Sequence, residues 1–373
     1  MDPRSAAPSH PDGQWHSAAS LPTHSGGPAP DLHRTSLFTS APMARKTAFT
    51  VFTCGFIIPA RRTGWQEDLE GPIQKGIVAI PWKGGEGARP SAPKAMRKQS
   101  FVLDLGKEGR IIRGDLYAAE DARRLPTLVI LHGFKGFKDW GFFPYAAETL
   151  AKRGFGVITF NFSMNGVGEN LFEFTELDKF ARNTYSREQE DVAKIIGEIK
   201  AGLLPPDGTL DPDRLGLIGH SRGGANSLLY ALEDPNVKGV VTWNGVADVD
   251  IFPEELKREI REKGVGTVLN ARTGQEMPIH REVLEDLEAN RERWNLLKRL
   301  PEWNRPLLIL QGDQDVSRLV EGAHQLHQAA PQSTLRILPG ANHTFGAVHP
   351  FQGSTPHLDR VLEETANFFA KVL

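Results

Sequence analysis

The sequence contains little cysteine, little net charge and no long apolar run. Its single cysteine, Cys54, excludes an intrachain disulfide and a zinc site made of cysteine ligands. The formal net charge of −2 indicates no excess of positive charge for binding nucleic acid or an anionic membrane surface. No window of about 20 consecutive apolar residues exists, so we expect no helix that spans a bilayer. The scarcity of cysteine fits a reducing compartment such as the cytoplasm, although an exported protein poor in cysteine would look the same.

The first 95 residues differ in composition from the rest of the chain. They hold 12 of the 26 prolines, and their short apolar stretches follow no long helical or strand period. Such a segment buries too little apolar surface to offset the conformational entropy of the chain. We therefore expect a disordered leader, or an over-extended start with Met96 as the true beginning. Two alternatives stay open: a functional binding arm, and an export signal that begins at Met43, where MARKTAFTVFTCGFIIPA combines a basic start with a short apolar middle.

From residue 96 to the end, apolar strand patterns alternate with helical patterns. This alternation is typical of an α/β protein with a mostly parallel sheet flanked by helices, in which ligands bind at the carboxyl ends of the strands. The expected strands are 98–105, 111–118, 125–131, 155–162, 214–218, 237–242, 306–310 and 335–338. The expected helices are 144–153, 186–201, 225–232 and 357–372.

Residues 250–300 interrupt the alternation of strands and helices. Two charged helical segments, near 253–263 and 280–300, are joined by the extended piece GVGTVLNARTGQEMP. Mixed charge is also typical of ordinary solvated surface helices. Because the segment lies between two core strands, we expect a small helical cap inserted over one end of the sheet.

A pentapeptide of the form G-x-S-x-G, residues 219–223, lies between an apolar strand pattern and a helical pattern. A sharp turn there lifts the Ser221 hydroxyl clear of the backbone, and small residues two positions before and after it avoid clashes. The start of the following helix adds a favourable dipole for developing negative charge. The pentapeptide alone is weak evidence, since a plain turn with a capping serine would look similar. Its position between strand and helix predicts that Ser221 is a nucleophile.

A serine hydroxyl is a poor nucleophile unless a neighbouring base takes its proton. His343, in the segment GANHTF, follows the last expected strand on a loop of small residues and is the best candidate. His349 is its rival. His220 adjoins Ser221 but is expected to face elsewhere, and His132 is expected to be structural.

The base in turn needs a carboxylate that fixes its tautomer and stabilises the imidazolium. In LLILQGDQD a strand ends and presents two acidic residues, of which Asp315 is placed to reach back toward His343. Asp313 is the alternative and is expected to be a turn residue. Along the chain, the nucleophile Ser221 is followed by the acid Asp315 and then the base His343. This order is typical of enzymes whose nucleophile lies on a turn between a strand and a helix.

An oxyanion hole requires two backbone N–H groups aimed at the developing negative charge. Arg222 follows the nucleophile and supplies one. The second is expected from Phe134, in the segment HGFKGFKDW after the strand at 125–131. A simple turn at His132-Gly133 is the alternative.

The chain resembles the α/β-hydrolase superfamily in four segments, LVILHGF, GHSRGG, LQGDQD and GANHTF. The resemblance is greatest to the dienelactone-hydrolase-like and feruloyl-esterase-like branches, which share features with the prolyl-oligopeptidase catalytic domain. The resemblance covers about residues 100–373. It implies an α/β-hydrolase fold with the Ser221–Asp315–His343 triad, the Phe134 and Arg222 oxyanion donors and a cap at 250–300. Dienelactone hydrolase itself has a cysteine nucleophile, whereas this chain has Ser221, so the resemblance implies the chemistry and not the substrate.

We therefore expect a serine esterase that acts on a small-molecule ester through an acyl-enzyme, with no metal and no organic cofactor. A small-peptide or amide hydrolase is the alternative, and a catalytically inactive binding protein is a further one. In the cap, Arg272 and Met277 are candidates to face the substrate. The residues expected to line the substrate pocket are Phe137, Trp140, Met164, Asn165, Trp243 and Asn244, with the alternative that such aromatic residues only pack the core or its rim.

Overall fold

The computed structural model describes residues 95–373. The alternatives predicted for the leader before residue 95 lie outside the described residues. Within residues 95–373, no helix is long and apolar enough to cross a membrane.

An eight-stranded sheet forms the centre of the described structure, with strand order β1-β2-β4-β3-β5-β6-β9-β10. The strands β1, β2 and β4 pair in antiparallel fashion at one edge, and every other pair is parallel. The prediction of a mostly parallel α/β sheet is therefore confirmed. The strands are β1 (Met96–Asp104), β2 (Ile111–Ala119), β3 (Leu125–Leu131), β4 (Gly156–Asn161), β5 (Leu210–His220), β6 (Val237–Trp243), β9 (Leu307–Gly312) and β10 (Thr334–Leu338).

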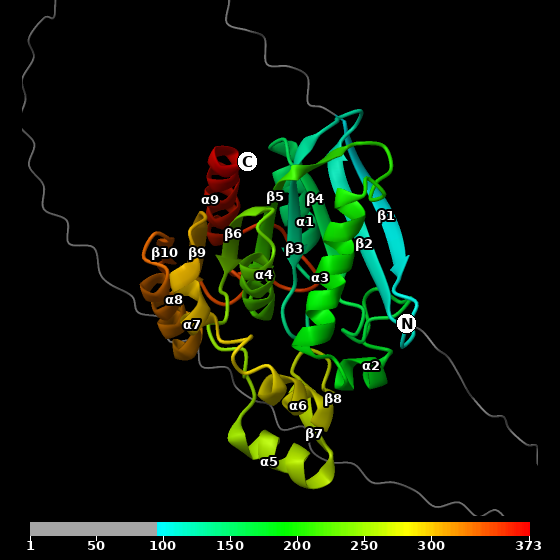
Figure 1. Cartoon of the computed structure of the whole chain (residues 1–373), viewed down its shortest axis with the longest axis vertical. Helices are drawn as coiled ribbons and strands as arrows, with labels where there is room; N and C mark the ends of the chain where they lie inside the picture. The colour runs from blue at the N-terminus through cyan, green and yellow to red at the C-terminus, as the bar shows by residue number, and fades with distance from the viewer. Residues whose placement is uncertain (1–94) are drawn as a thin grey trace, which may run out of the picture. The chain divides into compact units, whose positions relative to one another are not determined.

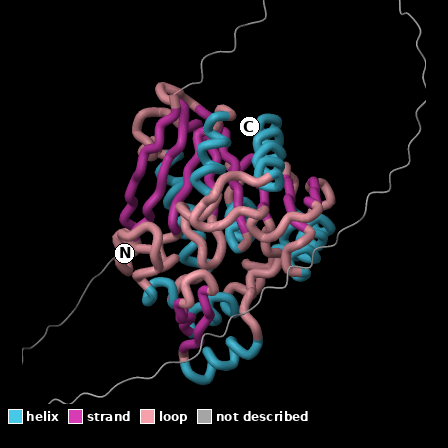
Figure 2. The backbone as a smooth tube through the Cα atoms, turned by 180° about the vertical axis from the view of Figure 1, so that it is seen from behind, coloured by secondary structure: helices cyan, strands magenta, loops and turns pink. Residues whose placement is uncertain are grey.

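Helices cover both faces of the sheet and bury two separate apolar clusters against it (Figures 1 and 2). The helices α1 (Phe143–Lys152) and α9 (Pro356–Val372) pack on one face. The helices α3 (Tyr185–Lys200), α4 (Arg222–Glu233) and α8 (Ser317–Ala329) pack on the other. In α3 the apolar residues that predicted a helix, Val192, Ile195, Ile196 and Ile199, are all buried toward the sheet.

Residues between β6 and β9 form the predicted insertion, drawn in yellow-green to yellow in Figure 1. It contains α5 (Glu254–Lys263), α6 (Arg281–Ala289) and α7 (Leu296–Arg299), followed by a short 3₁₀ turn at Leu300–Glu302. The extended joining piece is a hairpin of β7 (Val265–Asn270) and β8 (Gln275–His280). Gly264 ends α5 with a φ of 83°, a conformation that favours glycine, so the chain turns directly into β7. We call residues 250–300 the cap.

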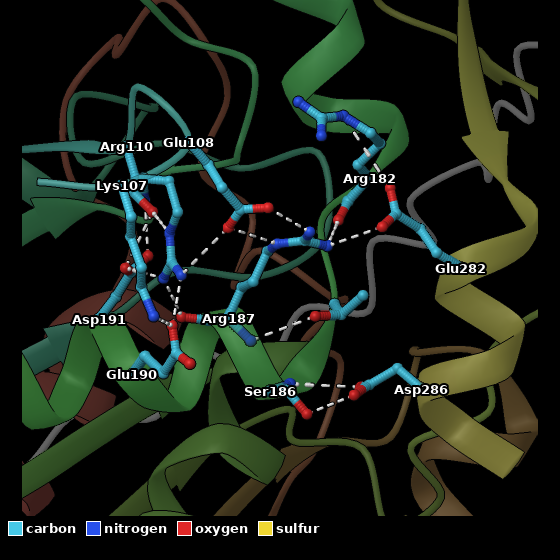
Figure 3. A network of polar contacts seen from close by, with 12 residues as sticks. Lys107, Glu108, Arg110, Arg182, Ser186, Arg187, Glu190, Asp191, Glu282 and Asp286 are labelled. Atoms are coloured by element: carbon cyan, nitrogen blue, oxygen red, sulfur yellow. Dashed lines mark hydrogen bonds and ion pairs between the residues drawn. The ribbon is translucent and has the colours of Figure 1, made fainter. Parts of the chain in front are cut away.

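The cap is fixed to α3 by a network of charged side chains (Figure 3). Arg187 of α3 forms ion pairs with Glu108 at 2.7 Å and with Glu282 of α6 at 3.2 Å. The backbone N–H of the neighbouring Ser186 donates to Asp286 of α6 at 3.2 Å. These contacts attach α6 to the helix that also packs against α4, which follows the candidate nucleophile.

Two helices were not expected from the sequence. The short α2 (Leu177–Ala181) packs against β8, and α8 connects β9 to β10. The apolar face of α8 is narrow, with Leu319, Ala323 and Leu326 buried. At Gly322 this helix packs closely on the segment that follows β6, since a Cβ added to Gly322 would be 3.1 Å from the Cβ of Ala247.

Candidate active site

Ser221 lies on the turn between β5 and α4, with φ 55° and ψ −121°. A non-glycine residue with this backbone conformation is strained, and its neighbours must hold it there. A Cβ added to Gly219 would overlap the carbonyl of Gly223, and one added to Gly223 would overlap the carbonyl of Leu131. The two glycines of the pentapeptide therefore permit close backbone approach on both sides of Ser221, which is the reason that the sequence analysis gave for them.

His343 and Asp315 form a hydrogen-bonded pair beyond the carboxyl ends of the strands β10 and β9. The Nδ1 of His343 donates to Oδ2 of Asp315 at 2.8 Å, which leaves Nε2 as the free acceptor of the ring. The Asp315 side chain is 2% exposed. Burial acts to raise its pKa, but the hydrogen bond and charge of His343 outweigh burial and hold the pKa of Asp315 below its usual value. A carboxylate that stays ionised suits the role of orienting an imidazole.

The rival residues lie elsewhere. Asp313 is exposed and accepts from the backbone N–H of Gly340 at 2.7 Å, which is the turn role expected of it. The Nδ1 of His349 accepts from the backbone N–H of Gly141 at 2.9 Å, and its ring stacks on Trp140.

The loop that carries His343 is held by two buried polar side chains. Nε2 of His220 donates to the carbonyl of His343 at 2.8 Å, and Nδ2 of Asn244 donates to the same carbonyl at 2.9 Å. Asn244 also accepts from the backbone N–H of Gly312 through Oδ1 at 2.8 Å, so it ties this loop to β9. Burial lowers the pKa of His220 to about 3, so the ring stays neutral.

The two predicted oxyanion donors belong to the two segments that adjoin Ser221. Arg222 is the first residue of α4, where no preceding carbonyl of the helix accepts the backbone N–H. Phe134 lies on the loop after β3, and this loop approaches the nucleophile closely, since a Cβ added to Gly133 would be 2.9 Å from the Cβ of Ser221. His132 shapes the loop: its buried ring contacts the carbonyl of Gly133 through Nδ1 at 2.9 Å and accepts from the backbone N–H of Phe162 at 3.2 Å.

The side chain of Arg222 points away from the candidate site into a buried cluster. Its Nε lies 2.8 Å from Oε2 of Glu188, and its guanidinium lies 3.8 Å from the centre of the Tyr185 ring. Both partners belong to the first turn of α3. No sequence pattern predicts this pair, because no local spacing relates residues 34 positions apart.

Two cavities meet at Ser221 and share Phe134, Lys135 and His343 in their linings. The smaller, of about 190 Å³, extends past Trp140 to the turn of the cap hairpin at residues 270–272. The larger, of about 430 Å³, extends over an apolar lining of Val246, Ile251, Phe252, Pro253, Val268, Val316 and Leu319. No hydrogen bond joins the described Ser221 hydroxyl to His343, although both line the two cavities. In enzymes without substrate such contacts are often long and tighten only in the complex.

The residues predicted to line the substrate pocket separate into two groups. Trp140 lines the smaller cavity, as does Arg272 of the cap, and Phe137 lines a neighbouring cavity next to His349. The expectation needs correction for the others, which are buried and line neither cavity at Ser221: Met164, Asn165, Trp243, Asn244 and, in the cap, Met277.

The physical reasons for these corrections are specific contacts. Nε1 of Trp243 donates to Oγ1 of Thr365 in α9 at 3.0 Å, so the indole belongs to the core on that face. Asn165 donates to the carbonyl of Gly136 at 3.3 Å, and Asn244 holds the loop of His343.

No group of three or more histidine, cysteine, aspartate or glutamate side chains that could hold a metal ion occurs within residues 95–373.

Comparison with known proteins agrees with the observed fold. A family model described as the alpha/beta hydrolase fold matches residues 126–268. The chain is 28% identical over 186 residues to thiohydrolase aneE of Aspergillus aculeatus, which covers 48% of this chain and 52% of that protein. It is 24% identical over 243 residues to the uncharacterized peptidase YuxL of Bacillus subtilis, which covers 61% of this chain and 32% of that protein. The chain thus spans about half or less of the length of these curated relatives.

Among solved structures, Est1E from Butyrivibrio proteoclasticus with bound ferulic acid is similar, with a TM-score of 0.55 at 18% identity, covering 73% of this chain and 98% of that chain. A hydrolase from Agrobacterium vitis gives a TM-score of 0.55 at 20% identity, covering 74% of this chain and all of that chain. At these identities the likeness shows the fold.

Proposed function

The chain has the α/β-hydrolase fold, and from that premise we propose that it is a serine hydrolase that cleaves carboxylic esters through a covalent acyl-enzyme. The observation that carries the proposal is the hydrogen-bonded pair of His343 and Asp315 in the larger cavity, which Ser221 also lines. A buried carboxylate, an oriented imidazole and a serine on a strained turn are the parts that acyl transfer requires.

In the proposed mechanism, Oγ of Ser221 attacks the acyl carbon while Nε2 of His343 takes its proton. The bond from Nδ1 of His343 to Asp315 keeps Nε2 unprotonated beforehand and stabilises the imidazolium afterwards. The backbone N–H groups of Phe134 and Arg222 hold the oxyanion, each contributing about 3–4 kcal/mol to stabilisation of the transition state. The leaving alcohol departs with the proton from His343, and a water activated by the same ring then hydrolyses the acyl-enzyme.

Hydrolysis of amides or small peptides is the second candidate. It is favoured by the similarity to YuxL, a protein named as a peptidase. The name of aneE in turn favours thioesters, whose carbonyl carbon would be attacked in the same way. An inactive binding protein is disfavoured, because the chain retains the serine, the histidine and the aspartate at one end of the sheet.

The test is hydrolysis of p-nitrophenyl esters with acyl chains from two to twelve carbons, a thioester and a p-nitroanilide, by the wild type and by Ser221→Ala. We expect turnover of esters that Ser221→Ala reduces by at least about a thousandfold. Turnover of the anilide alone would replace the ester proposal by the amide alternative. No turnover of any substrate by the wild type would contradict both.

A further inference from the structure

The smaller cavity at Ser221 carries positive charge without a matching carboxylate. Lys135 and Arg272 both line it, and no aspartate or glutamate does. Neither side chain forms an ion pair with any carboxylate of residues 95–373. Glu173 borders the adjoining cavity that Arg272 also lines, but no ion pair connects the two.

Two further donors of the same cavity are buried and have no acceptor. Nε1 of Trp140 and Nδ2 of Asn270 make no hydrogen bond, and both residues belong to the lining of the cavity. Trp140 is 8% exposed and Asn270 is 2% exposed. Leaving a buried donor unpaired costs about 1–3 kcal/mol, so an acceptor supplied from outside the chain would recover free energy at both atoms.

The two cations are held close together by the contact between the cap hairpin and the loop after β3. Nη2 of Arg272 donates to the carbonyl of Lys135 at 2.8 Å, and Nζ of Lys135 donates to the carbonyl of Leu269 at 3.1 Å. The guanidinium lies 5.1 Å from the centre of the Trp140 ring. Partial burial, and then the nearby charge of Arg272, lower the pKa of Lys135, while partial burial lowers the pKa of Arg272. Like charges in this arrangement repel unless an anion lies between them.

From these contacts we infer that the smaller cavity binds an anionic group of the substrate, a carboxylate or a phosphate, through Lys135, Arg272, Asn270 and Trp140. The inference rests on the proposed function and names its substrate class: esters or thioesters that carry a negative charge near the bond that is cleaved. The larger cavity, whose lining is mostly apolar apart from Lys135, Asp315, Arg318 and the Ser221 and His343 side chains, receives the uncharged part of the substrate. The cap thereby selects the substrate, because Asn270 and Arg272 belong to its hairpin.

The inference is tested with three anionic esters, each compared with a neutral analogue of similar size, using the full chain. p-Nitrophenyl hemiglutarate is compared with p-nitrophenyl valerate, which places a carboxylate on the acyl side. Butyrate esters of 4-hydroxybenzoate and 4-hydroxybenzamide place it on the leaving group. The butyrate ester of 4-hydroxyphenyl phosphate, compared with that of 4-methoxyphenol, places a phosphate there. For each pair the ratio of kcat/KM, anionic over neutral, is measured.

We expect at least one ratio to exceed unity clearly, and each of Arg272→Gln and Lys135→Gln to lower that ratio by about tenfold, as expected for one charge-assisted hydrogen bond. Because each ratio is taken within one variant, a variant that folds less well does not distort it. The ratio of the wild type should also fall as NaCl is raised from 0.05 to 0.5 M. The control is Lys263→Gln, which removes a cap charge that pairs with Glu259 within α5 and lines no cavity at Ser221.

The pair that shows the preference identifies the group and its side of the bond, and each such result supports the inference. Ratios near unity in all three pairs, or ratios that Lys263→Gln lowers as much as Arg272→Gln does, would overturn it. Neither result would affect the proposed function, which fails only if the neutral esters are not hydrolysed or are hydrolysed equally by Ser221→Ala.

Discussion

Loss of the Glu188 carboxylate is expected to destabilise the protein strongly, because it leaves the charge of Arg222 buried without a partner. The two side chains are 4% and 3% exposed and lie 2.8 Å apart. Nδ2 of Asn226 also donates to Glu188 at 2.7 Å, so the carboxylate serves two donors at once. Removing one partner of a buried ion pair costs about 3–5 kcal/mol, mostly as the penalty for the charge that remains.

The surface offers a control pair with a similar separation and different burial. Arg293 and Glu233 lie 2.7 Å apart, but their side chains are 47% and 35% exposed. An exposed pair of this kind contributes about 0–1 kcal/mol. Glu188→Gln should therefore lower the free energy of unfolding by about 3–5 kcal/mol, and Glu233→Gln by less than about 1 kcal/mol.

The assay is urea unfolding followed by circular dichroism for both variants and for Glu188→Gln combined with Arg222→Met. The double variant should lose less than Glu188→Gln alone, because no buried charge remains in it. Glu188→Gln should also lower kcat toward esters, since Arg222 carries a proposed oxyanion N–H. A loss below about 1 kcal/mol for Glu188→Gln, or a double variant in which the losses simply add, would refute the reasoning.

Three further predictions concern the glycines, the buried histidine and the carboxylate of the site. Gly219→Ala should abolish most ester hydrolysis, because the added Cβ overlaps the backbone of Gly223, and a fully active variant would contradict this. Gly197→Ala lies inside α3 with open space around it and should raise the free energy of unfolding by about 0.5–1 kcal/mol. Ester hydrolysis rates and urea unfolding check the two variants. The pKa of His220, about 3 in the folded chain, lies below that of an unfolded histidine, so the unfolded state protonates first and stability falls with pH below about 6.5. Of the loss that urea unfolding shows between pH 6.5 and 5, about 2 kcal/mol should disappear in His220→Asn and none in His324→Asn, which alters an exposed ring; the rest comes from the buried His132, whose pKa is lowered to about 4. Asp315→Asn should lower kcat by about 10⁴ with little change in KM, since Asn favours the wrong tautomer of the histidine; a loss below tenfold would count against the triad.

The sequence predicted the sheet and the candidate triad because both depend on local patterns. Apolar runs that alternate with helical spacing give the strand and helix order, and in a parallel sheet the residues that follow the strands meet at one edge. Ser221, Asp315 and His343 each follow such a run, so their position could be inferred without tertiary information. The hairpin of the cap was visible only as an extended piece, because its pairing depends on the turn after Asn270.

The direction in which a side chain points was the part that the sequence did not determine. Trp243 ends a strand beside the site, but its indole faces α9, and only the contact with Thr365 reveals this. Asn244 was expected to meet substrate and instead holds the loop of His343 through a hydrogen bond to its carbonyl. The positive φ of Asn244, 48°, is a conformation that asparagine tolerates, yet no pattern of neighbouring residues announces it. Lys135 was not singled out because its role depends on a hairpin more than 130 positions away.

The central claim is that Ser221 forms a covalent acyl-enzyme, and mass spectrometry of the enzyme during turnover tests it most directly. The full chain is mixed with p-nitrophenyl butyrate, quenched in acid within the first turnovers and digested with trypsin. We predict one butyryl group on the peptide Leu215–Arg222, carried by Ser221, and none on the same peptide from Ser221→Ala. Butyryl groups on another residue, or ester turnover that continues in Ser221→Ala without any acylated peptide, would contradict the account.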